Sequence, residues 1–257
     1  MQDLAGRVAV ITGASSGVGR AIALDLAQHG MQLCLVGRQR ETLEAVARTA
    51  RAASSRVCCY QADLAQESDI RQLATRLHTD CDGLDILIHS AGVIDLGRID
   101  CAPVEDLDRH YRVNLRAPYV LTQALLPTLR SRQGQIVFIN SSAGLNARSG
   151  VSQYAATKHA LKALADSLRE EVNTEGLRVL SVFLGRTATA MQAAVHKIED
   201  RAYEPQRLLQ PEDVAAVVIC AVSLPRTAEV TEIHVRPLNK PVETETAGAQ
   251  QPSESTR

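Results

Sequence analysis

At 257 residues, 45% of them hydrophobic, the chain is long enough to bury one core, which predicts a single large domain. A formal net charge of -1 and only 3% aromatic residues give no reason to expect a nucleic-acid or anionic-membrane partner. No apolar run reaches the roughly 18 residues of a membrane span, and the N-terminus has no signal-peptide pattern, so we expect a cytoplasmic protein. Six cysteines without C-x-x-C spacing predict reduced thiols, with no metal site and no disulfide framework.

The first apolar run, residues 7–12, predicts a short strand that is buried on both faces, as in a parallel sheet. A glycine-rich turn with Gly13, Gly17 and Gly19 follows, and then a helix over residues 20–28. This layout can hold a dinucleotide pyrophosphate, because glycines let the backbone approach the phosphates and the helix N-terminus offers unpaired N–H groups. The alternative is a plain turn that joins a strand to a helix.

Two further strands are expected at residues 32–36 and 56–61. In such folds the end of the second strand reaches the adenosine ribose. Arg38 stands there and suits a 2′-phosphate, so the sequence favours NADP(H) over NAD(H); a solvated surface arginine is the alternative. Asp63, at the end of the third strand, has two interpretations: it contacts the adenine edge, or it caps the next helix together with Gln66.

Helices and strands alternate along the rest of the chain. We expect helices over residues 68–79, 104–129 (broken or bent near Ala117 and Pro118), 152–173 and from 211, and strands over 84–89, 134–140, 177–184 and 229–236. A mobile loop with one or two short helices is expected over residues 186–210. The alternation predicts an α/β fold: a single Rossmann-type doubly wound parallel sheet of about seven strands, with helices on both faces. This domain would span residues 1–239, and the polar residues 240–257 would form a disordered tail.

Polar side chains follow the later strands. Asn114 lies within a predicted helix, where asparagine is unfavourable, so it either hydrogen-bonds a partner or occupies the helix surface. Ser141 and Ser142 follow the fifth strand, where a hydroxyl faces the ligand crevice or belongs to a turn. Tyr154 and Lys158 are four residues apart and share one helix face, so the ammonium can favour the phenolate and lower the pKa of the tyrosine.

In this order and at these separations, the residues resemble the short-chain dehydrogenase/reductase family over residues 4–237. The motifs that carry the resemblance are Thr12-Gly13-x-x-x-Gly17-x-Gly19, Asp63, Ser90-Ala91-Gly92, Asn114, Ser141 and Tyr154-x-x-x-Lys158. Each motif is weak alone, but the complete ordered set is specific.

The resemblance implies an NADP(H)-dependent oxidoreductase that interconverts a secondary alcohol, or a hydroxy acid, and its ketone. Tyr154 would be the general acid/base, and Lys158 would lower its pKa and hold the nicotinamide ribose. Ser141, which has Gly144 three residues after it, would bind the substrate oxygen, and Asn114 would fix a water that contacts Lys158. The implied cofactor contacts are Gly13, Ser15, Ser16, Gly17, Val18, Gly19, Arg38, Asp63, Leu64, Ala91, Gly92, Asn114, Tyr154, Lys158, Thr187 and Thr189.

The chain departs from the family pattern in three places. His89 replaces the usual asparagine after the fourth strand, and a buried hydrogen-bonded role is more common for such a histidine than catalysis. Leu184 replaces the proline before Gly185. The last strand is similar to the branch with NADP-dependent hydroxy-acid and serine dehydrogenases, which does not establish a substrate.

The partners implied are a small-molecule substrate and further copies of the chain, in a homodimer or homotetramer formed by the helices that carry Asn114 and Tyr154. Two other functions fit the same fold. A non-catalytic dinucleotide-binding redox sensor would typically lack the tyrosine or the lysine, and both are kept here. A nucleotide-sugar epimerase would need a larger C-terminal domain than the chain has after Lys158.

Overall fold

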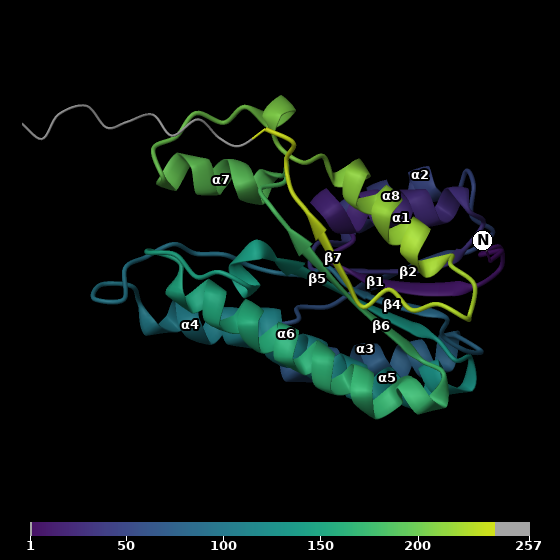
Figure 1. Cartoon of the computed structure of the whole chain (residues 1–257). Coiled ribbons are helices and arrows are strands. Elements are labelled where there is room, and N and C mark those ends of the chain that lie inside the picture. Colours follow the sequence, from purple (N-terminus) through teal and green to yellow (C-terminus); the bar gives the residue numbers. More distant parts are fainter. Residues whose placement is uncertain (1, 240–257) are drawn as a thin grey trace, which may run out of the picture.

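The computed structural model describes residues 2–239, so the tail expected over residues 240–257 lies outside the described part of the chain. Its centre is a seven-stranded sheet with the order β3-β2-β1-β4-β5-β6-β7, in which every neighbouring pair is parallel (Figure 1). The strands are β1 (Val8–Thr12), β2 (Gln32–Gly37), β3 (Val57–Gln61), β4 (Ile86–His89), β5 (Gln135–Ser141), β6 (Arg178–Leu184) and β7 (Glu232–Val235). The predicted fold class is confirmed.

Helices cover both faces of the sheet, which explains why the strands read as continuous apolar runs. One face packs against α1 (Gly17–Gln28), α2 (Arg40–Ala50) and α8 (Pro211–Val222). The other packs against α3 (Glu67–Asp80), α5 (Ala117–Ser131) and α6 (Ser152–Val172) (Figure 1). Two apolar cores therefore sandwich the strands and hold the strand ends in place.

The helix expected over residues 104–129 is divided into α4 (Val104–His110), a π-helical segment (Tyr111–Arg116) and α5. The expected break near Ala117 and Pro118 is confirmed, because α5 begins at Ala117; the irregular segment itself spans Tyr111–Arg116. Pro118 lies in the first turn of α5, and a proline near a helix start leaves few hydrogen bonds unmade. The wider π-helical turn, with its longer hydrogen-bonded spacing, contains Asn114.

The strand order reverses between β1 and β4, and such a switch point opens a ligand crevice at the carboxyl ends of the strands. The segment after β6 also lies at this end; it contains α7 (Ala190–Ile198) and a single 3₁₀ turn (Pro205–Arg207), in line with the short helices expected there (Figure 1). The mobility of this segment stays a prediction. Within residues 2–239, no helix combines the length and apolar character needed to cross a bilayer.

Candidate active site

The glycine-rich turn between β1 and α1 is shaped by close backbone contacts. Gly13 and Gly17 have φ angles of +66° and +52°, which side chains rarely adopt. A Cβ at Gly13 would lie 2.8 Å from the Cα of Ala91, and one at Gly19 would lie 2.4 Å from the oxygen of Gly13. Glycine is therefore required at Gly13 because the chain after β4 passes close to it, and at Gly19 because the turn folds back on itself.

The N-terminus of α1 opens toward the same crevice. Ser16 is its extended N-cap residue and makes no side-chain capping hydrogen bond. The first N–H groups of an α-helix have no intrahelical acceptor, so those of α1 are available to a bound anion. Ser15 and Val18 are half-buried, and Val18 packs against the core beneath the turn. The turn thus has the shape and the donors of a pyrophosphate cradle.

The loop after β6 closes against this turn. Thr189 caps α7 by accepting the N–H of Gln192 at 3.2 Å, and its Cγ2 lies 3.1 Å from the position of a Cβ at Gly17. Thr187 is buried and donates its hydroxyl to the oxygen of Gly185 at 3.1 Å. Thr189 thus lies beside the cradle, and Thr187 precedes it by two residues in the same loop.

Arg38 and Asp63 lie at the ends of β2 and β3. Arg38 is exposed, and its carbonyl accepts the Gln61 side chain at 3.1 Å. The carboxylate of Asp63 accepts the N–H of Ala65 at 3.0 Å in a turn before α3, next to buried Leu64. The capping alternative for Asp63 is wrong, because α3 begins at Glu67 and its N-cap residue makes no side-chain capping bond.

Ser141 ends β5 and faces α6. Its hydroxyl oxygen accepts the N–H of Ala143 at 3.1 Å, which leaves the hydroxyl proton for another acceptor. A Cβ at Gly144 would lie 2.7 Å from Asn140 Oδ1 and 2.8 Å from the carbonyl oxygen of Lys158. A residue with no side chain at position 144 therefore allows the turn after Ser141 to pack directly against α6.

Tyr154 and Lys158 lie on the first turns of α6. The buried ammonium of Lys158 donates to the carbonyl oxygen of Ile139 at 3.0 Å and lies 5.9 Å from the centre of the Tyr154 ring. Burial lowers the pKa of Lys158 to about 8. An amine with this pKa can gain and lose a proton near neutral pH.

The predicted direction of the Tyr154 pKa is wrong. Burial raises the pKa of Tyr154 above its ordinary value, because a partly apolar site disfavours the phenolate, and the hydroxyl of Ser141 acts in the opposite direction. The lysine is not among the causes of the shift. Tyr154 is thus held as a neutral phenol, the form that donates a proton.

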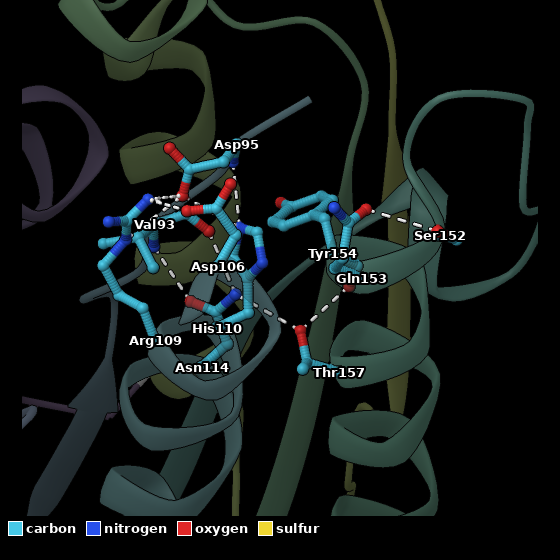
Figure 2. Close-up of polar contacts among 10 residues, drawn as sticks. All are labelled: Val93, Asp95, Asp106, Arg109, His110, Asn114, Ser152, Gln153, Tyr154 and Thr157. Carbon is cyan, nitrogen blue, oxygen red and sulfur yellow. Dashed lines mark hydrogen bonds and ion pairs between the residues drawn. The ribbon is translucent and has the colours of Figure 1, made fainter. Parts of the chain in front are cut away.

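Asn114 is fully buried rather than on the helix surface, and the expectation that it hydrogen-bonds a partner is confirmed. Its amide oxygen accepts the N–H of Val93 at 2.8 Å, and its amide nitrogen donates to the carbonyl of Val93 at 3.0 Å and to Thr157 Oγ1 at 3.2 Å (Figure 2). A Cβ at Gly92 would lie 3.4 Å from Asn114 Oδ1 and 4.0 Å from Lys158 Nζ. Gly92 therefore keeps open a small space between the asparagine and the lysine.

Comparison with known proteins agrees with this geometry. A family model described as short chain dehydrogenase matches residues 7–200. The chain is 33% identical over 239 residues to an uncharacterized oxidoreductase of Staphylococcus aureus (strain USA300), with 93% of this chain and 100% of the relative covered. This chain belongs to the short-chain dehydrogenase family. It is therefore an oxidoreductase of that family, with an NAD(P) cofactor typical of it.

Two solved structures of short-chain dehydrogenases are similar to the whole domain. A metagenomic short-chain oxidoreductase in complex with NADP has a TM-score of 0.80 and 32% identity, with 93% of this chain and 100% of that chain covered. A short chain dehydrogenase of Shigella flexneri 2a str. 301, complexed with NADP, has a TM-score of 0.83 and 30% identity, with 91% and 98% covered.

Two residues that organise the site of this short-chain dehydrogenase were not assigned a role from the sequence. Thr12 Oγ1 accepts the N–H groups of Ser90 and Ala91, both at 3.1 Å, and so ties the end of β1 to the turn after β4. Asn140 donates to the carbonyl of Lys158 at 3.1 Å and accepts the N–H of Ser141 at 2.8 Å. Thr12 is part of the quoted glycine motif, but no sequence pattern singled out Asn140.

His110 is a third residue that the sequence reading missed. It is fully buried one helical turn before Asn114, and its ring meets that of Tyr154 edge-on, with the ring centres 6.1 Å apart (Figure 2). His110 Nε2 accepts the N–H of Asp95 at 2.9 Å, and the carboxylate of Asp95 pairs with Arg109. Burial lowers the pKa of His110, which favours the neutral form of the ring. The neutral ring packs against the ring of Tyr154.

His89 has the structural role that was expected of it. It is buried, stacks on Phe138 with ring centres 5.0 Å apart, and exchanges a 2.8 Å hydrogen bond with Thr122. Burial lowers its pKa to about 3. His89 stands where the family usually has asparagine, and it packs as a neutral side chain between β5 and α5. Its contacts are with these two elements and not with the proposed catalytic residues.

Proposed function

We propose that this chain is an NADP(H)-dependent oxidoreductase that interconverts a secondary alcohol, or a hydroxy acid, and the corresponding ketone, with Tyr154 as general acid/base. The observation that carries the proposal is the arrangement at the ends of β4 and β5, where Ser141, Tyr154, Lys158 and Asn114 meet beside the glycine cradle. The bound nicotinamide would supply the hydride acceptor or donor. The protein would supply orientation, polarisation and a proton.

The residues divide this work by their chemistry. The neutral Tyr154 phenol would donate a proton to a carbonyl oxygen, or accept one from an alcohol as phenolate. Ser141 would polarise the same oxygen, since its hydroxyl proton is not used by its own hydrogen bond to Ala143. Lys158, with a pKa of about 8, would return the proton to the tyrosine. Asn114 would position a water in the space that Gly92 leaves beside Lys158.

The site fits a dinucleotide on structural grounds. The turn at Gly13, Gly17 and Gly19 presents backbone without side chains, because a Cβ at Gly13 or Gly19 would clash with the neighbouring backbone, and the helix N-terminus supplies donors. Arg38 would bind the 2′-phosphate, Asp63 and Leu64 would lie along the adenine, and Ala91 and Gly92 would line the ribose. Thr187 and Thr189 would contact the cofactor from the other side. The NADP in the two similar structures supports this choice of cofactor.

The chemical assignment is tested by following NADPH oxidation with a panel of ketones and 2-oxo acids. Tyr154→Phe should lower turnover by at least ~10² while leaving NADPH affinity within a few fold, because only the proton donor is removed. Tyr119→Phe, at an exposed tyrosine on α5, is the matched control and should retain full activity. Undiminished turnover in Tyr154→Phe would refute the chemistry. Tight NADPH binding with no turnover on any compound would favour the non-catalytic sensor.

The cofactor assignment has a separate test. Arg38→Asp should weaken NADPH binding by about 1–2 kcal/mol or more, because a charge-assisted pair is lost and a repulsive carboxylate is added. Arg48→Asp, an exposed arginine in the last turn of α2, makes the same change of charge away from the strand ends. Equal NADPH affinity in wild type and Arg38→Asp would remove the argument for the 2′-phosphate.

We also propose that the chain forms a homodimer or homotetramer through α5 and α6. Ala156, Ala163 and Ser167 are exposed on α6 and form a small-residue face that allows close helix packing. Light scattering on the purified chain should give a mass of two or four chains, and a monomer at micromolar concentration would exclude this assembly.

A further inference from the structure

Two cysteines from distant parts of the sequence lie against each other at the end of the sheet opposite the active site. Cys34 is buried in β2, and Cys81 is the half-buried residue that directly follows α3. Their sulfur atoms are 3.5 Å apart. This separation is a contact between two thiols that requires only a small movement to become a covalent bond.

The pair lies beside a cavity that is large enough to admit small molecules. Cys34 and Cys81 both line a cavity of about 790 Å³, which is formed at the amino-terminal ends of β1 and β2. Arginine side chains also line it, including Arg7, Arg56 and Arg226. An oxidant that enters the cavity therefore meets the half-buried Cys81, and Cys34 is buried next to it.

The surroundings make Cys81 the more reactive partner. A hydrogen bond from the Cys34 thiol and the positive charge of Arg56 lower the pKa of Cys81, while the carboxylates of Asp80 and Asp82 oppose the shift. The same contact and burial raise the pKa of Cys34. The thiolate is the nucleophile in thiol oxidation, so Cys81 would react first and Cys34 would remain a protonated thiol beside it.

We propose that Cys34 and Cys81 are a redox-active pair that forms a reversible disulfide on exposure to a hydroperoxide. The Cys81 thiolate attacks one peroxide oxygen, the O–O bond breaks, and Cys81 becomes a sulfenic acid as water or an alcohol leaves. Cys34 then attacks the Cys81 sulfur, the S–O bond breaks, and the hydroxyl group leaves as water with the proton of the Cys34 thiol. In total, two thiols lose two electrons and two protons, and the peroxide is reduced by two electrons.

The two sulfur atoms are already close, and formation of the bond requires a short movement. A disulfide needs the sulfur atoms at about 2.0 Å, so they must approach by roughly 1.5 Å. Cys34 is held between β1 and β3, but Cys81 has an extended conformation after the last turn of α3 and can turn toward it. The end of α3 is itself held near β3, because Asp80 accepts hydrogen bonds from Tyr60 and Arg56, both at 2.8 Å. The pair therefore stays together in the folded protein.

A third thiol could compete for Cys34. Cys58 lies opposite Cys34 in the register of β2 and β3, and it is half-buried. The Cys34 sulfur contacts that of Cys81, however, and Cys58 is fixed within a strand while Cys81 is not. We therefore assign the disulfide to Cys34 and Cys81.

Peptide mapping of the full chain tests this assignment. The purified protein is treated with hydrogen peroxide, denatured, alkylated and cleaved after arginine and lysine, which places Cys34, Cys58 and Cys81 on three separate peptides. The expected result is a Cys34–Cys81 cross-linked peptide, a loss of two free thiols per chain, and recovery of both by a dithiol reductant. A cross-link through Cys58, or irreversible oxidation of Cys81 without a cross-link, would overturn the proposal.

Variants provide the matched controls. Cys81→Ser, at the half-buried helix end, should abolish the loss of thiols and leave Cys34 reduced. Cys220→Ser, at an exposed cysteine on α8, should leave the cross-link unchanged. Retention of the thiol loss in Cys81→Ser, or its disappearance in Cys220→Ser, would show that other cysteines react and would overturn the assignment.

Discussion

The buried ammonium of Lys158 should lower the stability of the folded protein. Replacing Lys158 with methionine should therefore raise the free energy of unfolding and remove activity. The ammonium is buried, and burial lowers its pKa from 10.5 to about 8. At pH 7 the unfolded chain binds the lysine proton more tightly than the folded one, which costs the native state about 3 kcal/mol. Lys158→Met keeps a similar side-chain length without a charge. The variant avoids the cost of the buried charge but loses about 1 kcal/mol of stability with the hydrogen bond to Ile139.

The variant should therefore be more stable than wild type by about 2 kcal/mol near neutral pH. Because the folded-state pKa lies below the unfolded one, the wild type gains stability as the pH rises through the interval from 8 to 10.5, and the variant lacks this gain. From about pH 7 to about pH 10 the wild type should gain about 2.5 kcal/mol relative to the variant, which removes the advantage of about 2 kcal/mol that the variant has at neutral pH.

Urea denaturation of both proteins across this pH range measures the difference, and groups that titrate alike in both cancel. Turnover in the variant should fall by at least ~10² if Lys158 returns protons to Tyr154. A Lys158→Met protein that is less stable than wild type at neutral pH, or a difference that stays constant as the pH rises, would refute the reasoning. Such a result would mean that the ammonium is well solvated in its site.

Two further predictions concern positions where the structure leaves little freedom. Gly19→Ala should abolish NADPH binding and lower stability by about 1–3 kcal/mol, because its Cβ would lie 2.4 Å from the oxygen of Gly13. Gly6→Ala has open space around it but a φ of +73°, so it should also lose about 1 kcal/mol of stability while it keeps full NADPH affinity in a binding titration. His89→Asn should relieve acid sensitivity. The pKa of His89 is about 3 in the folded protein and about 6.5 in the unfolded chain, so the unfolded chain takes up a proton first as the pH falls. Wild type should therefore lose about 2 kcal/mol of unfolding free energy relative to the variant between about pH 7 and about pH 5. An equal change of unfolding free energy in both proteins would contradict this.

The fold and most of the site could be predicted because they depend on patterns that the sequence displays. Continuous apolar runs marked strands that are buried on both faces, and their predicted bounds agree closely for β1 to β6. The last strand is shorter than expected, Glu232–Val235 instead of residues 229–236, because the side chain of Glu229 accepts the N–H of Val179 at 2.9 Å. Here a side-chain carboxylate takes the place of a backbone carbonyl as the acceptor between two strands. The pattern of apolar and polar residues in the sequence does not reveal such an exchange.

Other features depend on contacts between elements that no local pattern contains. The π-helical segment around Asn114 keeps the composition of an ordinary helix, so the change of spacing is not visible in the sequence. The role of Asn140 depends on the carbonyl of Lys158, which comes from a different element. The pKa of Tyr154 was misjudged because spacing shows which charge is near but not how much water is excluded.

The positions of Ser141 and Lys158 are coupled through one strand end. Asn140 bonds both the backbone of Ser141 and the carbonyl of Lys158, and the ammonium of Lys158 reaches back to the carbonyl of Ile139. The proposed catalytic groups on β5 and α6 are therefore fixed relative to each other by two bonds from the Asn140 side chain to backbone groups and by one donor of the Lys158 ammonium. This support keeps the groups in place and leaves two of the three donors of the Lys158 ammonium for other partners, as preorganised catalysis requires. The cost of burying an ammonium in this framework is the reason why the site and the stability of the fold should respond in opposite directions to the loss of Lys158.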